Sequence, residues 1–333
     1  MAEGGTPRRV AIVVFPEAQV LDVAGPMEIL RAANLAQKKG GGDPAYAARI
    51  VAARSGAVPT SCGLQIVATH SFRDASPLLD TLIVAGGVVE AALEDRALVR
   101  YVRNRAQDAR RVVAIGTGVF VLAVAGLLDG RRATTHWRAC KELARRFPAI
   151  DVDGEHLFVR DGKFHTSAGA TAAIDQTLAL VQEDLGRELA MEVAHRKVMF
   201  LHRSGEERQV SSHLAAQMVG HERVARVVAW ILANLGREIT NDRVAEEAAM
   251  SARSMHRLFL REVGMPPARF IERARVDLAR RLLEESDLRV SAVARRCGMG
   301  SEERLRRAFH RLVGMSPRSY QSRRQAGETL RAR

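Results

Sequence analysis

The first 185 residues alternate short apolar runs with stretches of helical periodicity. The runs are apolar at nearly every position, a pattern typical of parallel strands that are buried on both faces. Helices between such strands cover the two faces of the sheet. The pattern therefore predicts an α/β sandwich with a mostly parallel sheet. Its strands are expected at Arg8–Phe15, Tyr46–Ala53, Leu79–Gly87 and Arg111–Gly116, with helices near Leu21–Leu35 and Asp95–Ala109.

The same part of the chain continues with shorter elements. A strand is expected at Ala133–Thr135, followed by a helix from Trp137. The stretch LFVRDGKFHTS contains the pair Asp161-Gly162, and such pairs favour tight hairpin turns because both central residues adopt positive φ. A last helix is expected over Thr171–Leu185. Sheets of this kind bind ligands beyond the carboxyl ends of their strands.

The stretch AIGTGVFVLAVAGLLDG (Ala114–Gly130) indicates a buried strand, a tight turn and an apolar helix. Hydrolytic α/β enzymes place a nucleophile on such an elbow, beside helix amides that hold a developing anion. Here the elbow begins at Gly116, which offers no thiol. The neighbouring Thr117 would need a base to act as a nucleophile, so we expect no catalytic residue here. The pair Gly86-Gly87 ends the preceding strand at the same edge of the expected sheet.

Beyond a polar, charged stretch from about Gly186 to Gly220, the chain repeats itself at a spacing of 49 to 50 residues. VAEEAAMSARSMHRLFLREVGMPP, from Val244, aligns with VARRCGMGSEERLRRAFHRLVGMSP, from Val293. Each copy predicts a short helix, a serine that caps the next helix, and a second helix with an apolar inner face. This pattern predicts an all-α domain with two helix-turn-helix motifs.

The outward positions of the second helix in each copy are candidate DNA contacts, because arginines hold phosphates and other side chains read base edges. A connecting helix from Pro267 of about 17 residues, roughly 25 Å, suits two readers about one DNA turn apart. The alternative is a helical bundle with an arginine-rich surface. The candidates are Arg253, His256, Arg257 and Arg261 in the first copy, and Ser301, Glu302, Glu303, Arg306 and Arg307 in the second.

The charge distribution separates the two parts of the chain. The net charge is +13, and His221–Arg333 holds 24 arginines, no lysines and 14 acidic residues, so +10 of the charge lies there. Surplus arginine alone is as typical of a solvated surface as of nucleic-acid binding. The repeat therefore carries the DNA-binding prediction, and the charge agrees with it.

Membrane and metal-binding classes find no support in the sequence. No apolar run reaches the roughly 18 residues of a membrane helix, and the first residues lack an apolar signal core. We therefore expect a cytoplasmic protein with no membrane partner. The cysteines Cys62, Cys140 and Cys297 have neither CxxC nor Cys/His spacing, which predicts ordinary packed or loop thiols, no metal site and no cofactor.

The sequence also resembles a known family. The stretch RVSAVARRCGMGSEERLRRAFHRLVGMSP resembles the DNA-binding domain of AraC/XylS-type transcriptional regulators. The front part, with VLDVAGPMEIL, LIVAGG and GTGVFVLAVAGLLDGRRATTHW, is similar to the PfpI-type, glutamine amidotransferase-like superfamily. Together they resemble the bacterial GlxA group of AraC regulators. The resemblance implies a flavodoxin-like, class I amidotransferase-like domain at 1–188, a linker at 189–220 and an AraC-type DNA-binding domain at 221–325.

Enzymes of this superfamily carry a cysteine on the elbow, a carboxylate near the end of the first strand and often a histidine after the elbow helix. The resemblance maps these positions to Gly116, Asp22 and His136. Asp22 either caps the following helix or faces a pocket, and His136 and Trp137 either pack or line that pocket. An acid opposite an indole suits a cationic or zwitterionic effector. The candidate ligand-binding residues are Asp22, Gly86, Gly87, Gly116, Thr117, His136 and Trp137.

These observations predict a transcriptional regulator and not an enzyme. The degenerate front pocket is expected to sense a small metabolite of the amino-acid, amine or betaine class, and the rear domain to bind double-stranded promoter DNA. The alternative is an active amidase, hydratase or glyoxalase-like enzyme with a DNA-tethering module, against which the missing thiol at Gly116 argues. The resemblance further implies a homodimer, with RNA polymerase as an additional partner.

Overall fold

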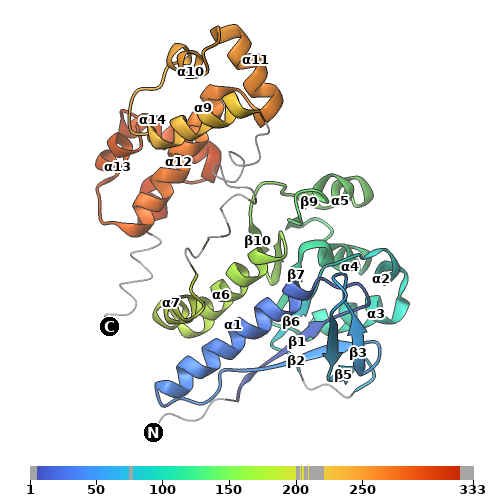
Figure 1. Cartoon of the computed structure of the whole chain (residues 1–333). Helices are drawn as coiled ribbons and strands as arrows, with labels where there is room; N and C mark the ends of the chain where they lie inside the picture. Colours follow the sequence, from blue (N-terminus) through green and yellow to red (C-terminus); the bar gives the residue numbers. More distant parts are fainter. Residues whose placement is uncertain are drawn as a thin grey trace. The chain divides into compact units, whose positions relative to one another are not determined.

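The structure is a computed structural model that describes residues 6–74, 78–199, 203, 205, 209 and 221–322. It divides into two compact units, Met1–Gln209 and Val210–Arg333 (Figure 1). Residues 210–220 of the predicted linker and residues 323–325 of the predicted DNA-binding domain lie outside the described residues.

The first unit is built on a seven-stranded sheet with the strand order β10-β11-β7-β6-β1-β2-β5. Every neighbouring pair is parallel except the hairpin of β10 and β11. The prediction of a mostly parallel sheet is therefore confirmed. The strands are β1 (Arg8–Val13), β2 (Tyr46–Ala52), β5 (His70–Ser71), β6 (Thr81–Val84), β7 (Arg111–Ile115), β10 (Phe158–Asp161) and β11 (Phe164–Ser167).

Helices accompany this sheet in two groups (Figure 1). The helices α1, α6 and α7 pack against one another, and α2, α3 and α4 form the second group. A 3₁₀ turn at Gly116–Gly118 connects β7 to α4. The helices are α1 (Val20–Lys39), α2 (Glu90–Glu94), α3 (Arg96–Asp108), α4 (Val119–Val124), α5 (Cys140–Arg146), α6 (Thr171–Leu185) and α7 (Arg187–Arg196).

The first unit departs from the predicted elements at its end and near its middle. The predicted boundary at residue 188 lies inside α7, which contributes Ala190 and Val193 to the core, so the unit continues past that boundary. A hairpin near residue 60 is not among the predicted elements, and the apolar side chains of Leu64 and Val67 are exposed there. The small strands are β3 (Gly56–Pro59) with β4 (Gln65–Ala68), and β8 (Arg132–Ala133) with β9 (Asp151–Val152).

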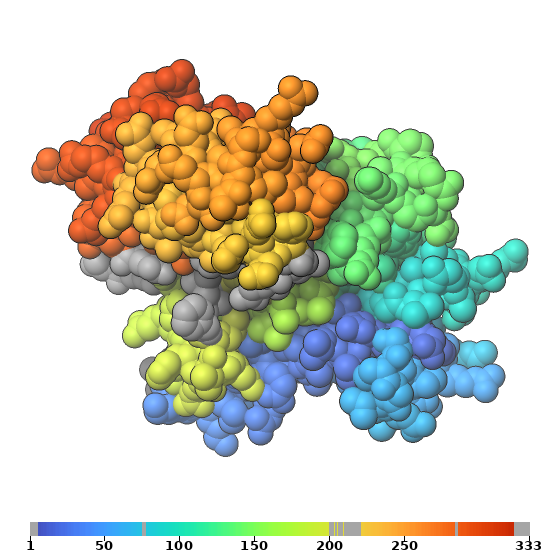
Figure 2. All heavy atoms as spheres, turned by 45° about the horizontal axis from the view of Figure 1, so that its top comes forward, coloured from blue at the N-terminus to red at the C-terminus, as the bar shows by residue number. Residues whose placement is uncertain are grey.

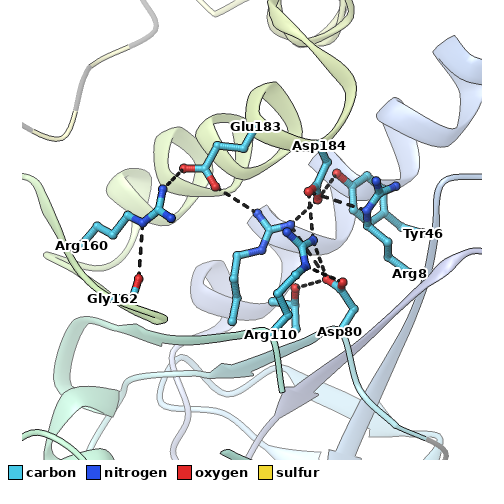
Figure 3. Close-up of polar contacts among 10 residues, drawn as sticks. Arg8, Tyr46, Asp80, Arg110, Arg160, Gly162, Glu183 and Asp184 are labelled. Carbon is cyan, nitrogen blue, oxygen red and sulfur yellow. Dashed lines mark hydrogen bonds and ion pairs between the residues drawn. The ribbon is translucent and has the colours of Figure 1, made fainter. Parts of the chain in front are cut away.

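A cluster of charged side chains attaches α6 to the edge of the sheet where the strands begin (Figure 3). Arg111 is 4% exposed, and its guanidinium donates to the carboxylate of Asp184 on α6. Asp184 also accepts hydrogen bonds from Arg110 and from the hydroxyl of Tyr46, both at 2.9 Å. Burial, followed by the nearby Asp184 carboxylate, raises the pKa of Tyr46 above its ordinary value. This cluster lies where the strands begin, whereas the elbow follows the carboxyl end of β7 at the opposite edge.

Every secondary-structure element that the structure describes in the second unit is a helix, and α12 contacts both groups of the others. One apolar cluster joins α9, α10 and α11 to the first half of α12, and another joins α13 and α14 to its second half. Leu278 packs against both clusters. The predicted all-α domain is therefore confirmed. The helices are α9 (Glu222–Ala233), α10 (Asn241–Glu247), α11 (Ala252–Val263), α12 (Pro267–Glu285), α13 (Val290–Arg296) and α14 (Glu302–Val313).

The cysteines are all free thiols: Cys140 and Cys297 are buried, and Cys62 is exposed. Within the described ranges, no three or more His, Cys, Asp and Glu side chains are grouped as a metal site. Nor does any helix in those ranges combine the length and apolar character needed to cross a lipid bilayer.

Candidate functional site

The elbow after β7 keeps the backbone of a nucleophile turn but carries a glycine. Gly116 has φ +53°, a conformation that L side chains rarely adopt and that is typical of strained functional turns. A Cβ at this position would lie 3.5 Å from Oδ2 of Asp22 and 3.3 Å from the Cα of Gly169. A side chain at this position would therefore point toward the carboxylate of Asp22, in a strained conformation and in tight contact with Gly169. Because Gly116 has no thiol, this position provides no nucleophile.

Close backbone approach explains two further glycines around the elbow. A Cβ on Gly118 would lie 2.6 Å from the carbonyl oxygens of both Val84 and Ala85 at the end of β6. A Cβ on Gly86 would lie 2.6 Å from the carbonyl oxygen of Ile115. The ends of β6 and β7 thus come together only because these positions lack side chains.

Asp22 is the buried charge of this site. Its carboxylate is 2% exposed and accepts hydrogen bonds from the backbone amides of Gly86 at 3.0 Å and Ala170 at 2.7 Å. Burial raises its pKa to about 6, against the lowering effect of these two hydrogen bonds. The helix α1 begins at Val20, with Gln19 as its cap, so Asp22 is not the capping residue. Its carboxylate instead connects three separate segments at the elbow.

Thr117 and Gly87 bind each other. The hydroxyl of Thr117 donates to the carbonyl oxygen of Gly87 at 2.7 Å and accepts from its amide at 2.8 Å. This hydroxyl is therefore engaged in both directions, which agrees with the expectation that it is not a nucleophile. The amide of Gly87, expected to face a ligand, is occupied by a side chain of the protein.

His136 and Trp137 follow β8 in the chain. Trp137 is 45% exposed, its ring lies 5.7 Å from that of His136, and the guanidinium of Arg138 stacks 4.9 Å from its centroid. Burial, and then the charge of Arg138, lowers the pKa of His136. The structure therefore groups Asp22, Gly86, Gly87, Gly116 and Thr117. Within the described residues, the ring contacts of Trp137 are with His136 and Arg138, not with Asp22.

The helices α11 and α14 have matching ends in the second unit. Ser251 caps α11 by accepting from the amide of Ser254, and Ser301 caps α14 by accepting from that of Arg304. Each helix ends at a left-handed glycine, Gly264 or Gly314. All nine predicted DNA contacts are exposed on these helices or their caps. Figure 2 shows side chains projecting from the surface of this unit, drawn in yellow to red.

The two helices differ in how their arginines are held. On α14, Glu303 pairs with Arg306 at 2.8 Å and with Arg307 at 3.3 Å, and the hydrogen bond from Arg306 lowers the pKa of Glu303. On α11, neither Arg253 nor Arg257 has an ion pair with any described residue. Arg253 and Arg257 on α11 therefore present guanidinium groups without an ion pair to a described residue, whereas Arg261 on the same helix pairs with Glu262 at 3.0 Å. On α14, Arg306 and Arg307 are attached to a carboxylate.

Sequence comparison relates both units to known families. Residues 8–183, more than half of the chain, match the DJ-1/PfpI family. The chain belongs to the DJ-1/PfpI family. Residues 244–323 match a helix-turn-helix domain, so this DJ-1/PfpI protein carries an AraC-type second unit. The chain is also 28% identical over 319 residues to the HTH-type transcriptional regulator GlxA of Rhizobium meliloti, 95% of this chain and 96% of GlxA. The resemblance to the GlxA group of AraC/XylS regulators is thereby confirmed.

Similar proteins include a regulator and an enzyme. The HTH-type transcriptional regulator CdhR of Pseudomonas aeruginosa is 31% identical over 307 residues, 92% of this chain and 89% of CdhR. The isonitrile hydratase of Pseudomonas putida is 38% identical over 183 residues, 55% of this chain and 74% of the hydratase. A crystal structure of a ThiJ/PfpI family protein from Pseudomonas syringae is 27% identical, with a TM-score of 0.53, covering 60% of this chain and 78% of that one. Of these three proteins, the regulator is the one that aligns along both units.

Two residues of the predicted linker make hydrogen bonds to the DJ-1/PfpI unit. The amide and Nε of Arg203 donate to the buried carboxylate of Asp175, at 3.0 and 2.9 Å. The side-chain amide of Gln209 donates to the carbonyl oxygen of Thr135 at 2.8 Å. The hydroxyl of Thr135 donates in turn to the carbonyl oxygen of Gly116, also at 2.8 Å. Gln209 is therefore connected to the elbow through a single residue.

Proposed function

We propose that this protein is a sequence-specific transcriptional regulator that binds double-stranded promoter DNA with α11 and α14. The observation that carries the proposal is the duplication: two helices with the same serine cap and the same terminal glycine flank α12. The 19 residues of α12 make a rod of about 28 Å, close to the ~34 Å between successive major grooves on one side of DNA. Full-length similarity to an HTH-type regulator supports the same function.

The DNA contacts follow from the exposed faces of the two helices. Arginines hold phosphates or guanine edges, and glutamates accept from cytosine. Glu302 and Glu303 also lie in the first turn of α14, where carboxylates are favourable to the helix dipole and unfavourable to phosphate. We therefore assign α11 more of the affinity and α14 more of the discrimination. The proposed contacts are Arg253, His256, Arg257, Arg261, Ser301, Glu302, Glu303, Arg306 and Arg307.

The first unit, in this proposal, binds an effector and catalyses no reaction. Asp22 supplies a buried carboxylate, and among the described residues no side-chain cation pairs with it. A small amine, amino acid or betaine-like metabolite supplies the missing positive charge. Trp137 contributes if the effector cation replaces Arg138 on its ring, a contact worth roughly 0.5 to 2 kcal/mol.

The enzyme alternative has one specific observation in its favour, the similarity of the first unit to an isonitrile hydratase. Gly116 stands against it, because covalent catalysis at the elbow needs a nucleophile. The test is turnover of isocyanide, amide and dicarbonyl substrates by the purified chain. We expect no saturable activity above a heat-inactivated control, and saturable turnover would replace the sensor assignment.

Gln209 couples the effector site to the DNA-binding unit in this proposal. Its side chain contacts Thr135, and Thr135 contacts the elbow beside Asp22. A ligand that moves the elbow changes the hydrogen bonds that hold Gln209, which lies at the end of the first unit. Such a coupling requires that the ligand binds with different affinity to the elbow with and without the hydrogen bond between Gln209 and Thr135.

Two experiments test the proposal as a whole. The first is an electrophoretic shift with the DNA upstream of the protein's own gene, for which a scrambled duplex is the control. The second is a thermal-shift screen of amino acids, amines and betaines, in which a ligand at 100 times its Kd stabilises by about 2.7 kcal/mol. If the protein does not bind the upstream DNA in preference to the scrambled duplex, the proposed regulator function is wrong. From the family resemblance we also propose that the protein forms a homodimer and that RNA polymerase is a partner. Sedimentation measures the oligomeric state.

A further inference from the structure

The second unit carries a groove of about 580 Å³ whose walls are rich in arginine. The helix α12 contributes Arg269, Glu272 and Arg275, and α14 contributes Arg304, Arg307 and Arg311. The spacing of three to four residues places each set along one face of its helix. The two helices therefore present rows of charged side chains to a shared groove, and most of the other lining residues are apolar.

Some of these side chains are already occupied. Glu272 pairs with Arg311 across the groove, from one helix to the other. The guanidinium of Arg275 donates to the carbonyl oxygens of Leu235 at 3.1 Å and Arg237 at 2.6 Å, so Arg275 is fixed in the wall. These contacts fix the walls of the groove, and they engage the guanidinium groups of Arg275 and Arg311.

Two positive charges of the groove are not balanced by an acidic side chain. Five arginines and one glutamate line it, a formal charge of +4, and Glu303, outside the lining, pairs with Arg307. Arg269 and Arg304 are exposed and have no ion pair with any described residue. Burial lowers the pKa of Arg275, and the charge of Arg304 lowers it further, so positive charges repel each other here. Such a groove concentrates anions.

We propose that this groove binds successive phosphates of one DNA strand beside the recognition helix α14. The inference rests on the proposed function and adds a site to it. Arg307 belongs both to the groove and to the exposed face of α14, so DNA that meets that face continues into the groove. From Arg304 to Arg311 the helix advances about 10 Å, a length sufficient to reach neighbouring phosphates, since one strand carries a phosphate about every 3.4 Å of the DNA axis.

The test compares two double variants of the full chain in equilibrium titrations at several salt concentrations. R269A/R304A removes the two unpaired groove charges, and R223A/R226A removes two exposed charges from α9, outside the groove. The probes are a duplex from upstream of the protein's own gene and a scrambled duplex of equal length. A lysine pair, R269K/R304K, keeps the charge, and thermal unfolding confirms that each variant folds.

R269A/R304A should weaken binding to both duplexes by the same factor and lower the salt slope by about two. The loss of affinity between 50 and 200 mM salt then becomes about tenfold smaller than for the unmodified chain. The α9 pair and the lysine pair should keep the original slope.

An unchanged slope for R269A/R304A overturns the groove as a phosphate site, and the regulator remains if Arg257→Ala still weakens binding. A changed preference between the duplexes also overturns it, because the groove would then read bases. If the unmodified chain does not prefer the upstream duplex, the proposed function itself fails.

Discussion

Replacing Asp22 by asparagine tests whether the carboxylate at the elbow is desolvated. Burial raises its pKa from 3.8 to about 6, so the folded protein favours the protonated carboxyl more than the unfolded chain does. This contribution to stability is fully present below the unfolded-state pKa and is lost as the pH rises through the folded-state pKa. At about 1.36 kcal/mol per pKa unit, it amounts to about 3 kcal/mol for this side chain, which is 2% exposed.

Asparagine does not titrate, so the difference in unfolding free energy between the original chain and Asp22→Asn isolates this carboxyl. About 2 kcal/mol of the difference should disappear between about pH 4.5 and 7.5, with the original chain losing stability relative to the variant. Asparagine also loses one of the two hydrogen bonds, a pH-independent offset of about 1 kcal/mol.

Urea unfolding followed by tryptophan fluorescence measures this difference. The chain has two tryptophans, and in a Trp230→Phe background Trp137 alone reports the first unit. A difference that stays constant within about 0.5 kcal/mol across this pH range refutes the desolvated carboxylate. A difference that grows with pH indicates that Asp22 is paired with a cation, and the proposed effector class then loses its basis.

Two further predictions concern coupling and packing. Gln209→Ala should keep the thermal stabilisation by an effector but lose the effector's influence on DNA affinity, because the contact to Thr135 is removed. The exposed Gln182→Ala on α6 is the control, and an effector response that survives in Gln209→Ala contradicts the coupling. Gly118→Ala should lower the unfolding free energy of the first unit by at least about 2 kcal/mol, because its Cβ would meet two carbonyl oxygens at 2.6 Å. Gly154→Ala, whose Cβ makes only ordinary contacts, should change it by less than about 0.5 kcal/mol, and equal effects of the two substitutions would contradict the packing argument.

The sequence predicts the elements whose signals are local. The central strands are runs of apolar residues, and α11 and α14 are marked by a serine at one end and a glycine at the other. Repetition reinforces that signal, because the same pattern occurs twice. The exposed hairpin of β3 and β4 lacks such a signal, because an outward position of β4 holds the apolar Val67 and the sequence therefore does not alternate polar with apolar residues.

The contacts at the candidate site depend on residues far apart in the chain. Asp22 binds amides 64 and 148 residues away, so its sequence context does not distinguish a helix cap from a buried bridge. The ring of Trp137 is covered by the adjacent Arg138, which composition alone does not reveal. Gln209 lies in a polar stretch without periodicity, and only the fold brings it to Thr135.

The paired readers are the central claim, and the most direct test is a binding titration of Arg257→Ala and Arg307→Ala. Both are measured on the upstream and scrambled duplexes at several salt concentrations, with Arg226→Ala as the control. Arg257, which has no ion pair with a described residue, should contribute more affinity than Arg307, which Glu303 holds at 3.3 Å. Loss of a base contact should cost about 1 to 3 kcal/mol on the upstream duplex and relax its preference, whereas loss of a phosphate contact should weaken both duplexes alike. Unchanged affinity in both variants would contradict the account, because these helices would then not face DNA.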